Sequence, residues 1–245
     1  MNNHFKTPIT LWLLLMLLGF IPNAIQAQQK NTVKFNLLPL VSKTFAFEYE
    51  REFKPNMTLN TSIGFRGKSS IPFKNLWEDI IEDEKFLSDA KLSHFTLSPE
   101  LRFYTSRRKE GARGFYVGPF IKYAKYNFST NYEYETDEGN FSELPINGGI
   151  GTWSAGVAIG SQFKLSKSIF LDFRILGPHY GFSDVNLKGK QSLTQHEQDY
   201  LREELQDLEN DFIKIETEVN SEGVTMKAKG PWAGIRAGLS IGYRF

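Results

Sequence analysis

Side chains of two kinds alternate strictly along the last stretch of the chain, from Gly234 to Phe245. One set is apolar or aromatic, and the other consists of glycine, serine and arginine. Because successive residues of a strand point to opposite faces, the pattern predicts one apolar face and one face that is polar and sterically small. Such a strand is typical of a β-barrel wall between lipid and a narrow polar lumen.

The same two-residue period recurs along the chain and predicts eight strands. They are expected over residues 32–38, 45–50, 59–66, 94–103, 115–128, 153–160, 169–175 and 232–245. Connections after the second, fourth and sixth strands are short. Those after the third, fifth and seventh are long, and only the first connection on that side is short. This asymmetry predicts an all-β fold, an eight-stranded antiparallel transmembrane β-barrel with both termini in the periplasm.

Three long connections are expected, over residues 67–92, 129–149 and 182–230. Acidic residues 77–84 favour one or two helical turns in the first connection. Residues 137–140 have the composition of a turn in the second. We therefore expect most of the structure outside the barrel to lie in the third.

The connection over 182–230 has a helical and a hairpin pattern. Thr194 and Glu197 have capping-box spacing, which marks the start of a helix. An apolar stripe follows at helical spacing and consists of Leu201, Leu205, Leu208 and Phe212. Alternating residues around the turn 220–223 predict a hairpin. We favour a lid that packs on this hairpin and the barrel rim; the alternative is a docking helix for a partner.

Residues 1–27 have the features of a cleaved secretory signal. A basic residue, Lys6, precedes an apolar run over 9–21, and small residues precede the polar start of the remaining chain. The run is shorter than the roughly 20 residues that a spanning helix needs. We expect cleavage after Ala27 and an outer-membrane domain over 28–245.

Composition narrows the classes of function. The chain has no cysteine, which excludes disulfides, thiolate metal sites and a lipidated cysteine anchor. Its 29 lysines and arginines balance 28 aspartates and glutamates, so we expect no nucleic-acid partner. Its 20 glycines, 10 tyrosines and 21 phenylalanines are typical of a β-rich protein at a membrane interface.

Charged residues recur at the inward positions of the predicted strands. They are Glu48, Glu50, Glu100, Asp172, Arg66, Arg102, Lys122, Arg174, Arg236 and Arg244. Charges are costly in lipid, and an eight-stranded barrel is just wide enough for side chains to fill, so we expect these charges to pair in the lumen. We interpret them as a structural ion-pair plug rather than as acid–base residues or a proton path.

Little in the sequence favours catalysis. His94, His179 and His196 are scattered without metal-ligand spacing. The segment His94-Phe95-Thr96 is only loosely similar to the His-x-Ser pair of lipid A deacylase barrels, and His94 with Glu100 would be the one starting point for such an enzyme. We expect no catalytic, cofactor-binding or metal-binding residues, and no cofactor.

Several segments carry a family resemblance: residues 34–40, 47–50, 171–181 and 230–238, together with the acidic helix of the last loop. They resemble the small outer-membrane barrels of Bacteroidota catalogued as domain of unknown function 3575, which are OmpA/OmpX-like. The terminal strand, with Tyr243 and Phe245, is similar to the signal that the barrel-assembly machinery reads. The resemblance implies a fold and a location in the outer membrane, and it brings no catalytic residues.

These patterns favour a non-enzymatic barrel that contributes to envelope structure or surface contact through its loops. Its expected partners are outer-membrane lipids, the assembly machinery, and a surface or envelope protein bound by the loops. The alternatives are a lipid-modifying enzyme and a narrow pore. A pore would need a lumen free of the charges named above.

Overall fold

The computed structural model describes residues 30–74, 84–105, 112–136, 141–206 and 214–245. The expected signal peptide at 1–27, almost all of the acidic segment 77–84 and the turn 137–140 lie outside these residues. No described helix is long and apolar enough to cross a membrane.

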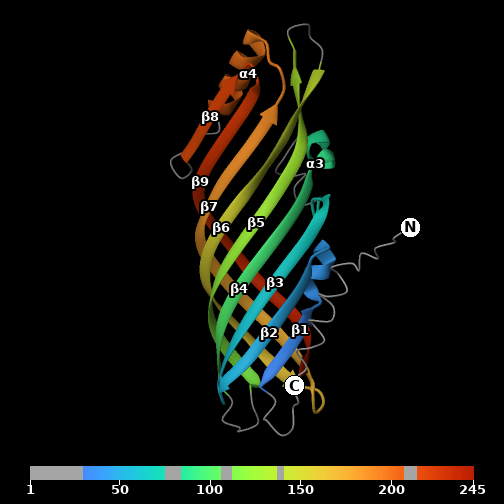
Figure 1. Ribbon diagram of the computed structural model, residues 1–245, viewed down its shortest axis with the longest axis vertical. Helices are drawn as coiled ribbons and strands as arrows, with labels where there is room; N and C mark the ends of the chain where they lie inside the picture. The colour runs from blue at the N-terminus through green and yellow to red at the C-terminus, as the bar shows by residue number, and fades with distance from the viewer. Residues whose placement is uncertain (1–29, 75–83, 106–111, 137–140, 207–213) are drawn as a thin grey trace, which may run out of the picture.

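Nine antiparallel strands of the described chain form one sheet in the order β1-β2-β3-β4-β5-β6-β7-β9-β8 (Figure 1). Because β1 also pairs with β9, eight strands close into a ring, while β8 lies beside β9 outside it. The strands are β1 (Asn31–Asn36), β2 (Phe45–Lys54), β3 (Met57–Ser70), β4 (Lys91–Tyr104), β5 (Gly114–Glu135), β6 (Phe141–Lys164), β7 (Ile169–Lys190), β8 (Lys214–Asn220) and β9 (Gly223–Arg244). The predicted eight-stranded antiparallel barrel is confirmed, with one strand added.

The first strand ends earlier than predicted, and a 3-10 helix, η1 (Leu38–Ser42), follows it. The Asn36 side chain starts this turn, because its Oδ1 accepts a hydrogen bond of 3.2 Å from the backbone N–H of Leu38. Lys43 ends it in a left-handed conformation, φ 57°, and its N–H donates to the carbonyl of Leu40 at 2.9 Å. Thus β1 is the shortest strand of the ring.

The barrel wall places apolar side chains outside and polar side chains inside, which is the reverse of a soluble protein. On β2, Phe45 and Phe47 point outward and are about half exposed, whereas Glu48 and Glu50 point inward and are buried. Phe47 stacks against Phe65 of the neighbouring β3, with ring centroids 6.3 Å apart. An apolar exterior around a polar interior is the arrangement of strands that face lipid.

Four strands, β5, β6, β7 and β9, run for 22 or 24 residues and reach far beyond the short strands of the ring (Figure 1). The loops predicted over 129–149 and at the start of 182–230 are therefore wrong, whereas the helix and the hairpin predicted within 182–230 are confirmed: a helix covers Gln195–Gln206, and β8 pairs with β9 around the turn 220–223. Strand occupies 129–135, 141–149, 182–190, 214–220 and 223–230. Beyond residue 124 of β5, on the side away from the short turns, these four strands form a region that we call the extension. It also includes β8 and the helices α3 (Glu84–Asp89) and α4 (Gln195–Gln206).

The reason for the error is that the alternation continues while the roles of the two faces exchange. Along the barrel part of β5, outward side chains such as Ile121 are apolar. In the extension, the outward positions hold Lys125 and Asn127, and the inward ones hold Phe128 and Tyr132. A strand that leaves lipid for water must exchange its faces in this way to keep its apolar side covered.

Candidate functional site

The interior of the barrel is filled near the short-turn end, where β2–β3, β4–β5 and β6–β7 are joined. Asp172 of β7 forms ion pairs of 2.5 Å with both Lys34 Nζ and Arg102 Nη1, and it accepts a hydrogen bond of 3.0 Å from Tyr116 Oη. Glu50 lies 2.5 Å from the same Lys34. These side chains come from β1, β2, β4, β5 and β7, so the contacts tie the wall together across the lumen.

Two further glutamates extend this network toward the middle of the barrel. Glu48 Oε2 lies 3.1 Å from Arg174 Nη2. Glu100 lies 2.6 Å from Arg102 Nε and 3.3 Å from Arg236 Nη1. We call the seven central residues the plug: Lys34, Glu48, Glu50, Glu100, Arg102, Asp172 and Arg174. All are buried, and breaking such a group is costly because it leaves a buried charge without its partner.

Glycines of the terminal strand make room for the plug. A Cβ at Gly242 would lie 2.9 Å from Cγ of Lys34, and one at Gly238 would lie 2.7 Å from Nδ2 of Asn36 and 3.2 Å from Nη1 of Arg174. The alternation of glycine along this strand therefore provides the space that long inward side chains occupy.

The structure brings together most, but not all, of the predicted lumen charges. Among the described residues no carboxylate pairs with Arg66, Lys122 or Arg244, contrary to the expectation. Arg244 instead donates to Thr32 Oγ1 at 3.0 Å and to the carbonyl of Ala112 at 2.9 Å. The alternation identifies which charges face inward, but it does not give their height along the barrel.

Lys34 is the plug residue that the sequence analysis missed. It contacts two carboxylates and donates to Gln162 Oε1 at 2.5 Å. Its inward position follows from alternation with Val33 and Phe35, so the signal was present in the sequence.

A second group of basic side chains lies above the plug. We call it the cationic layer: Arg66 of β3, His94 of β4, Lys122 of β5, His179 of β7 and Arg236 of β9. Arg66 and His94 are ladder partners. Lys122 pairs with Ser154 of β6, and His179 pairs with Gly156, two residues further along the same strand. On its other side His179 pairs with Gly234, two residues before Arg236 on the same face of β9.

The cationic layer has few polar partners. The guanidinium of Arg236 lies 4.3 Å from the ring centroid of Phe120 and contacts Glu100 of the plug. His94 Nε2 lies 3.4 Å from Thr44 Oγ1. Arg66 Nη2 donates to the carbonyl of Ser70.

Aromatic side chains lie above the cationic layer. Tyr126 contacts Trp232 across the lumen, with ring centroids 5.6 Å apart, and it also contacts His94 at 5.5 Å. Higher still, Phe128 contacts Phe86 of α3 at 5.9 Å. These rings separate the charged interior of the barrel from the interior of the extension.

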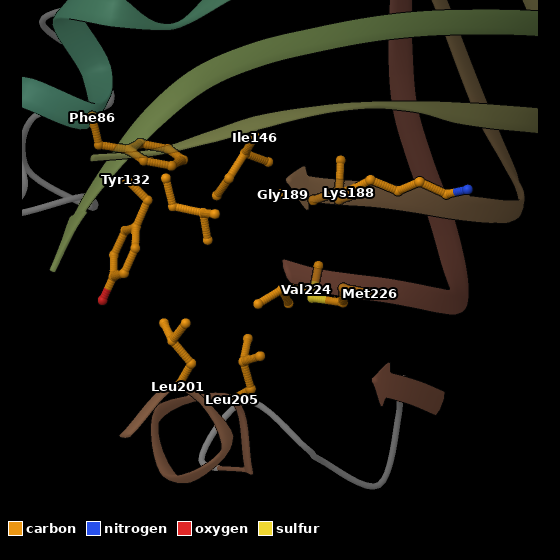
Figure 2. Close-up of a pocket in the computed structure, with 11 residues that line it drawn as sticks. Phe86, Tyr132, Ile146, Lys188, Gly189, Leu201, Leu205, Val224 and Met226 are labelled. Atoms are coloured by element: carbon orange, nitrogen blue, oxygen red, sulfur yellow. The ribbon is translucent and has the colours of Figure 1, made fainter. Parts of the chain in front are cut away.

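The extension encloses an apolar pocket of about 310 Å³ (Figure 2). Leu201 and Leu205 of α4 point into it from one side, and Val224 of β9 and Ile146 of β6 point into it from the strands. Its remaining lining residues are Phe86, Tyr132, Leu144, Leu187, Lys188, Gly189 and Met226. The lining is almost wholly hydrocarbon, so this site is suited to an apolar ligand.

Helix α4 is fixed over the pocket by its N-terminus and by β8. Thr194 and Glu197 form the predicted capping box: the Thr194 N–H donates to Glu197 Oε2 at 2.7 Å, and the Glu197 N–H donates to Thr194 Oγ1 at 3.3 Å. Arg202 Nη2 donates to the carbonyl of Val219 at 2.8 Å. Leu201 packs in a buried cluster with Leu144. Leu208 and Phe212 of the predicted stripe lie outside the described residues.

The residues considered for catalysis are not brought together. His94 and Glu100 lie six positions apart on β4, or roughly 20 Å along a strand. His94 contacts Thr44, whereas Glu100 is held by arginines of the lumen. No group of three His, Asp or Glu side chains in the described part of the chain could hold a metal ion.

The end of β9 closes the ring. The N–H of Phe245 donates to the carbonyl of Asn31 at 2.8 Å, and the N–H of Asn31 donates to the carbonyl of Phe245 at 3.1 Å. Tyr243 and Phe245 stack on the outer surface with centroids 6.4 Å apart. The predicted assembly-signal residues are thus exposed where the last strand meets the first.

Solved barrels resemble the chain only remotely. The translocator domain of the autotransporter NalP from Neisseria meningitidis is 12% identical over 97% of this chain and 95% of its own, with a TM-score of 0.35. The outer-membrane protease OmpT from Escherichia coli is 8% identical over 88% and 93%, with a TM-score of 0.37. The β-domain of the Bordetella autotransporter BrkA is 10% identical over 89% and 99%, with a TM-score of 0.30.

No curated protein matches the chain. One family profile matches residues 11–202, which include the barrel up to β7 and most of α4. Its description is "Protein of unknown function", and it is the family that the sequence motifs resemble. The chain belongs to the DUF3575 family of proteins of unknown function.

Proposed function

We propose that this protein is a non-enzymatic outer-membrane barrel whose extension stands outside the cell and binds a small apolar molecule there. The apolar exterior of the ring and its polar interior support the membrane location. The short connections at one end and the extension at the other support the orientation, with both termini in the periplasm.

The observation that carries this proposal is the apolar pocket. Its volume of about 310 Å³ is about twice the ~150 Å³ of an apolar cavity that binds benzene. It therefore has room for a ligand of roughly a dozen non-hydrogen atoms, such as a medium-length acyl chain. A pocket of this kind buries most of the surface of its ligand and gains affinity from the hydrophobic effect.

The plug supports a closed lumen rather than a pore. Its carboxylates and cations lie within 2.5 to 3.1 Å of one another across the barrel, for example at Lys34–Asp172 and Glu48–Arg174. Moving these groups apart would leave buried charges without partners. The separation of His94 from Glu100 favours binding over lipid chemistry as the task of this protein.

Binding to the pocket can be tested with the folded protein in lipid nanodiscs. An environment-sensitive apolar dye should bind saturably, and decanoate should displace it. Val224→Trp fills the pocket and should weaken dye binding at least tenfold. Lys227→Trp adds the same ring to the exposed outer face of β9 and should bind the dye as the wild type does.

Two results would contradict the proposal. One is that the dye and decanoate fail to bind to folded wild-type protein. The other is that Val224→Trp and Lys227→Trp bind equally well, since binding would then occur elsewhere. Loss of a cross-linked surface protein in Leu205→Ser, without any effect on dye binding, would instead favour protein docking by α4.

A further inference from the structure

The cationic layer contains more positive charge than the structure neutralises. Arg66, Lys122 and Arg236 face one lumen, and Glu100 is the only carboxylate that contacts the layer among the described residues. Glu100 is already shared with plug arginines, since it lies 2.6 Å from Arg102 Nε and 3.4 Å from Arg174 Nε. Arg66 is buried, and Lys122 and Arg236 are half-buried. Cations that are removed even partly from water without counter-charges are unfavourable, so the layer is suited to an anion.

Several polar side-chain atoms in and beside the layer are buried without a hydrogen-bond partner in the described structure. They are Nε and Nη1 of Arg66, Nδ1 of His94, Nδ1 of His179 and Oγ of Ser154. Arg66, His179 and Ser154 are 4%, 7% and 5% exposed, so bulk water does not solvate them freely. Lys122 forms neither an ion pair nor a hydrogen bond with any described residue. Buried polar groups normally have partners, which makes this group exceptional.

The wall around these donors is built from small residues. Ser154 is the ladder partner of Lys122, so the two side chains project from adjacent positions on the inner face. A Cβ at Gly234 would lie 2.9 Å from Nε2 of His179, and one at Gly156 would lie 2.8 Å from Cβ of the same histidine. Glycine at both positions therefore leaves room for the imidazole of His179 in the lumen.

We propose that the cationic layer binds a phosphate group, with Lys122, Arg66 and Arg236 supplying positive charge and Ser154 and His179 donating hydrogen bonds. Phosphate carries more than one negative charge and offers several acceptor oxygens, which matches convergent cations and donors better than a single carboxylate does. This site is distinct from the apolar pocket, because the Tyr126–Trp232 contact lies between them.

Next to this site, the backbone ladder on the β1 side of β9 is interrupted. On the side of β9 that faces β1, residues 240–244 pair with β1 and residues 223–229 pair with β8. Residues 230–238, which include Gly234 and Arg236, have no ladder partner on that side among the described residues. A phosphate-bearing lipid could therefore approach from the membrane, and free phosphate could approach from the open end of the barrel.

The two sources can be separated with folded protein in nanodiscs of digalactosyldiacylglycerol, a bilayer-forming lipid without phosphate. In one arm, inorganic phosphate is titrated and the melting temperature is followed. In the other, phosphatidic acid is added to the nanodiscs, and native mass spectrometry detects lipid retained by the released protein. We expect a rise in melting temperature or a retained phosphatidic acid, and the arm that responds identifies the source.

Substitutions in the layer test whether its side chains bind phosphate or only stabilise the fold. Lys122→Gln should weaken binding in the responding arm at least about tenfold, because hydrogen bonds to charged groups contribute that much. Ser154→Ala should weaken it less. Lys125→Gln, on the outer face of the same strand, is the matched control and should bind normally. Lys122→Gln should also melt higher than the wild type without phosphate, because it removes an unpaired charge.

The proposal is overturned if neither arm responds, or if Lys122→Gln binds phosphate as tightly as Lys125→Gln. It is also overturned if Lys122→Gln melts lower than the wild type in the absence of phosphate, since Lys122 would then have a structural partner. None of these results depends on dye binding by the apolar pocket.

Discussion

Strand β7 passes through two regions with opposite construction. In the barrel, Asp172 points inward and is 2% exposed, while its neighbour Phe173 points outward and is 44% exposed. In the extension, Asn186 points outward, while Leu187 points inward and lines the apolar pocket. The two-residue period is the same in both regions. The outer face changes from apolar to polar along the strand, as expected for a strand that passes from lipid into water.

The comparison shows that one continuous sheet can have two interiors. The interior of the barrel is held by charges that have left water, and the interior of the extension is held by apolar packing as in a soluble protein. The same kind of substitution should therefore have different effects in the two regions.

The largest effect is expected from removing a plug carboxylate. Glu100→Ala leaves Arg236 without a carboxylate partner among the described residues and removes one of the partners of Arg102, so it should lower the free energy of unfolding by about 3–5 kcal/mol. Asp184→Ala removes an exposed partner of Lys229 in the extension and should change it by less than about 0.5 kcal/mol. Denaturant unfolding in detergent micelles measures both. Equal effects would contradict the distinction between the two interiors.

A smaller effect is expected on the outer face. Phe173→Arg places a charge on the apolar exterior and should destabilise the barrel by about 2–4 kcal/mol if the site lies near the middle of the membrane. Asn186→Arg, on the outer face of the same strand in the extension, should have almost no effect. Unfolding from lipid vesicles, with the gel shift between unheated and boiled samples as the readout, compares the two. A tolerated Phe173→Arg would show that this surface does not face lipid.

Packing of the extension should be separable from the barrel. Leu201→Ala removes buried contacts with Leu144 and should cost about 2–3 kcal/mol within the extension, the lower end of the range for such changes because the pocket leaves some contacts unmade. We expect faster proteolysis of α4 and an unchanged gel shift of the barrel. Loss of the gel shift would mean that the ring depends on the extension for its stability.

The smallest effect is expected at the helix cap. Thr194→Ala removes the side chain that accepts the Glu197 N–H and should destabilise α4 by about 1 kcal/mol. Amide hydrogen exchange of residues 195–206 would measure this change. Exchange in β7 near Asp172 should stay at its wild-type rate, and a change there would show that the two regions are coupled.

Much of the barrel could be predicted because each ring strand has a clear period of two. The faces of β2 and the closing strand follow directly from residues such as Phe47, Glu48 and Gly242. The extension could not be predicted in the same way, because its strands exchange apolar and polar faces near Tyr123 and contain glycines such as Gly149. Such a segment resembles a loop when only outward apolar residues are counted.

The candidate sites were harder to predict than the fold. Alternation shows that Arg66 and Lys122 point inward, but it does not show that every plug carboxylate lies below them. The apolar pocket depends on side chains from both helices and four strands, such as Leu201, Ile146 and Val224. Their convergence requires the register of the sheet, which the sequence does not specify. The bacterial phylum and the signal peptide stay predictions.

The most direct test of the two-region account uses cysteine labelling, because the chain contains no cysteine of its own. Single cysteines at Phe173 and Ile121 of the barrel and at Asn186 and Lys125 of the extension can be exposed to a membrane-impermeant maleimide on intact cells. We predict rapid labelling of Asn186→Cys and Lys125→Cys, and none of Phe173→Cys and Ile121→Cys until the membrane is dissolved. Labelling of all four at the same rate on intact cells would contradict the account.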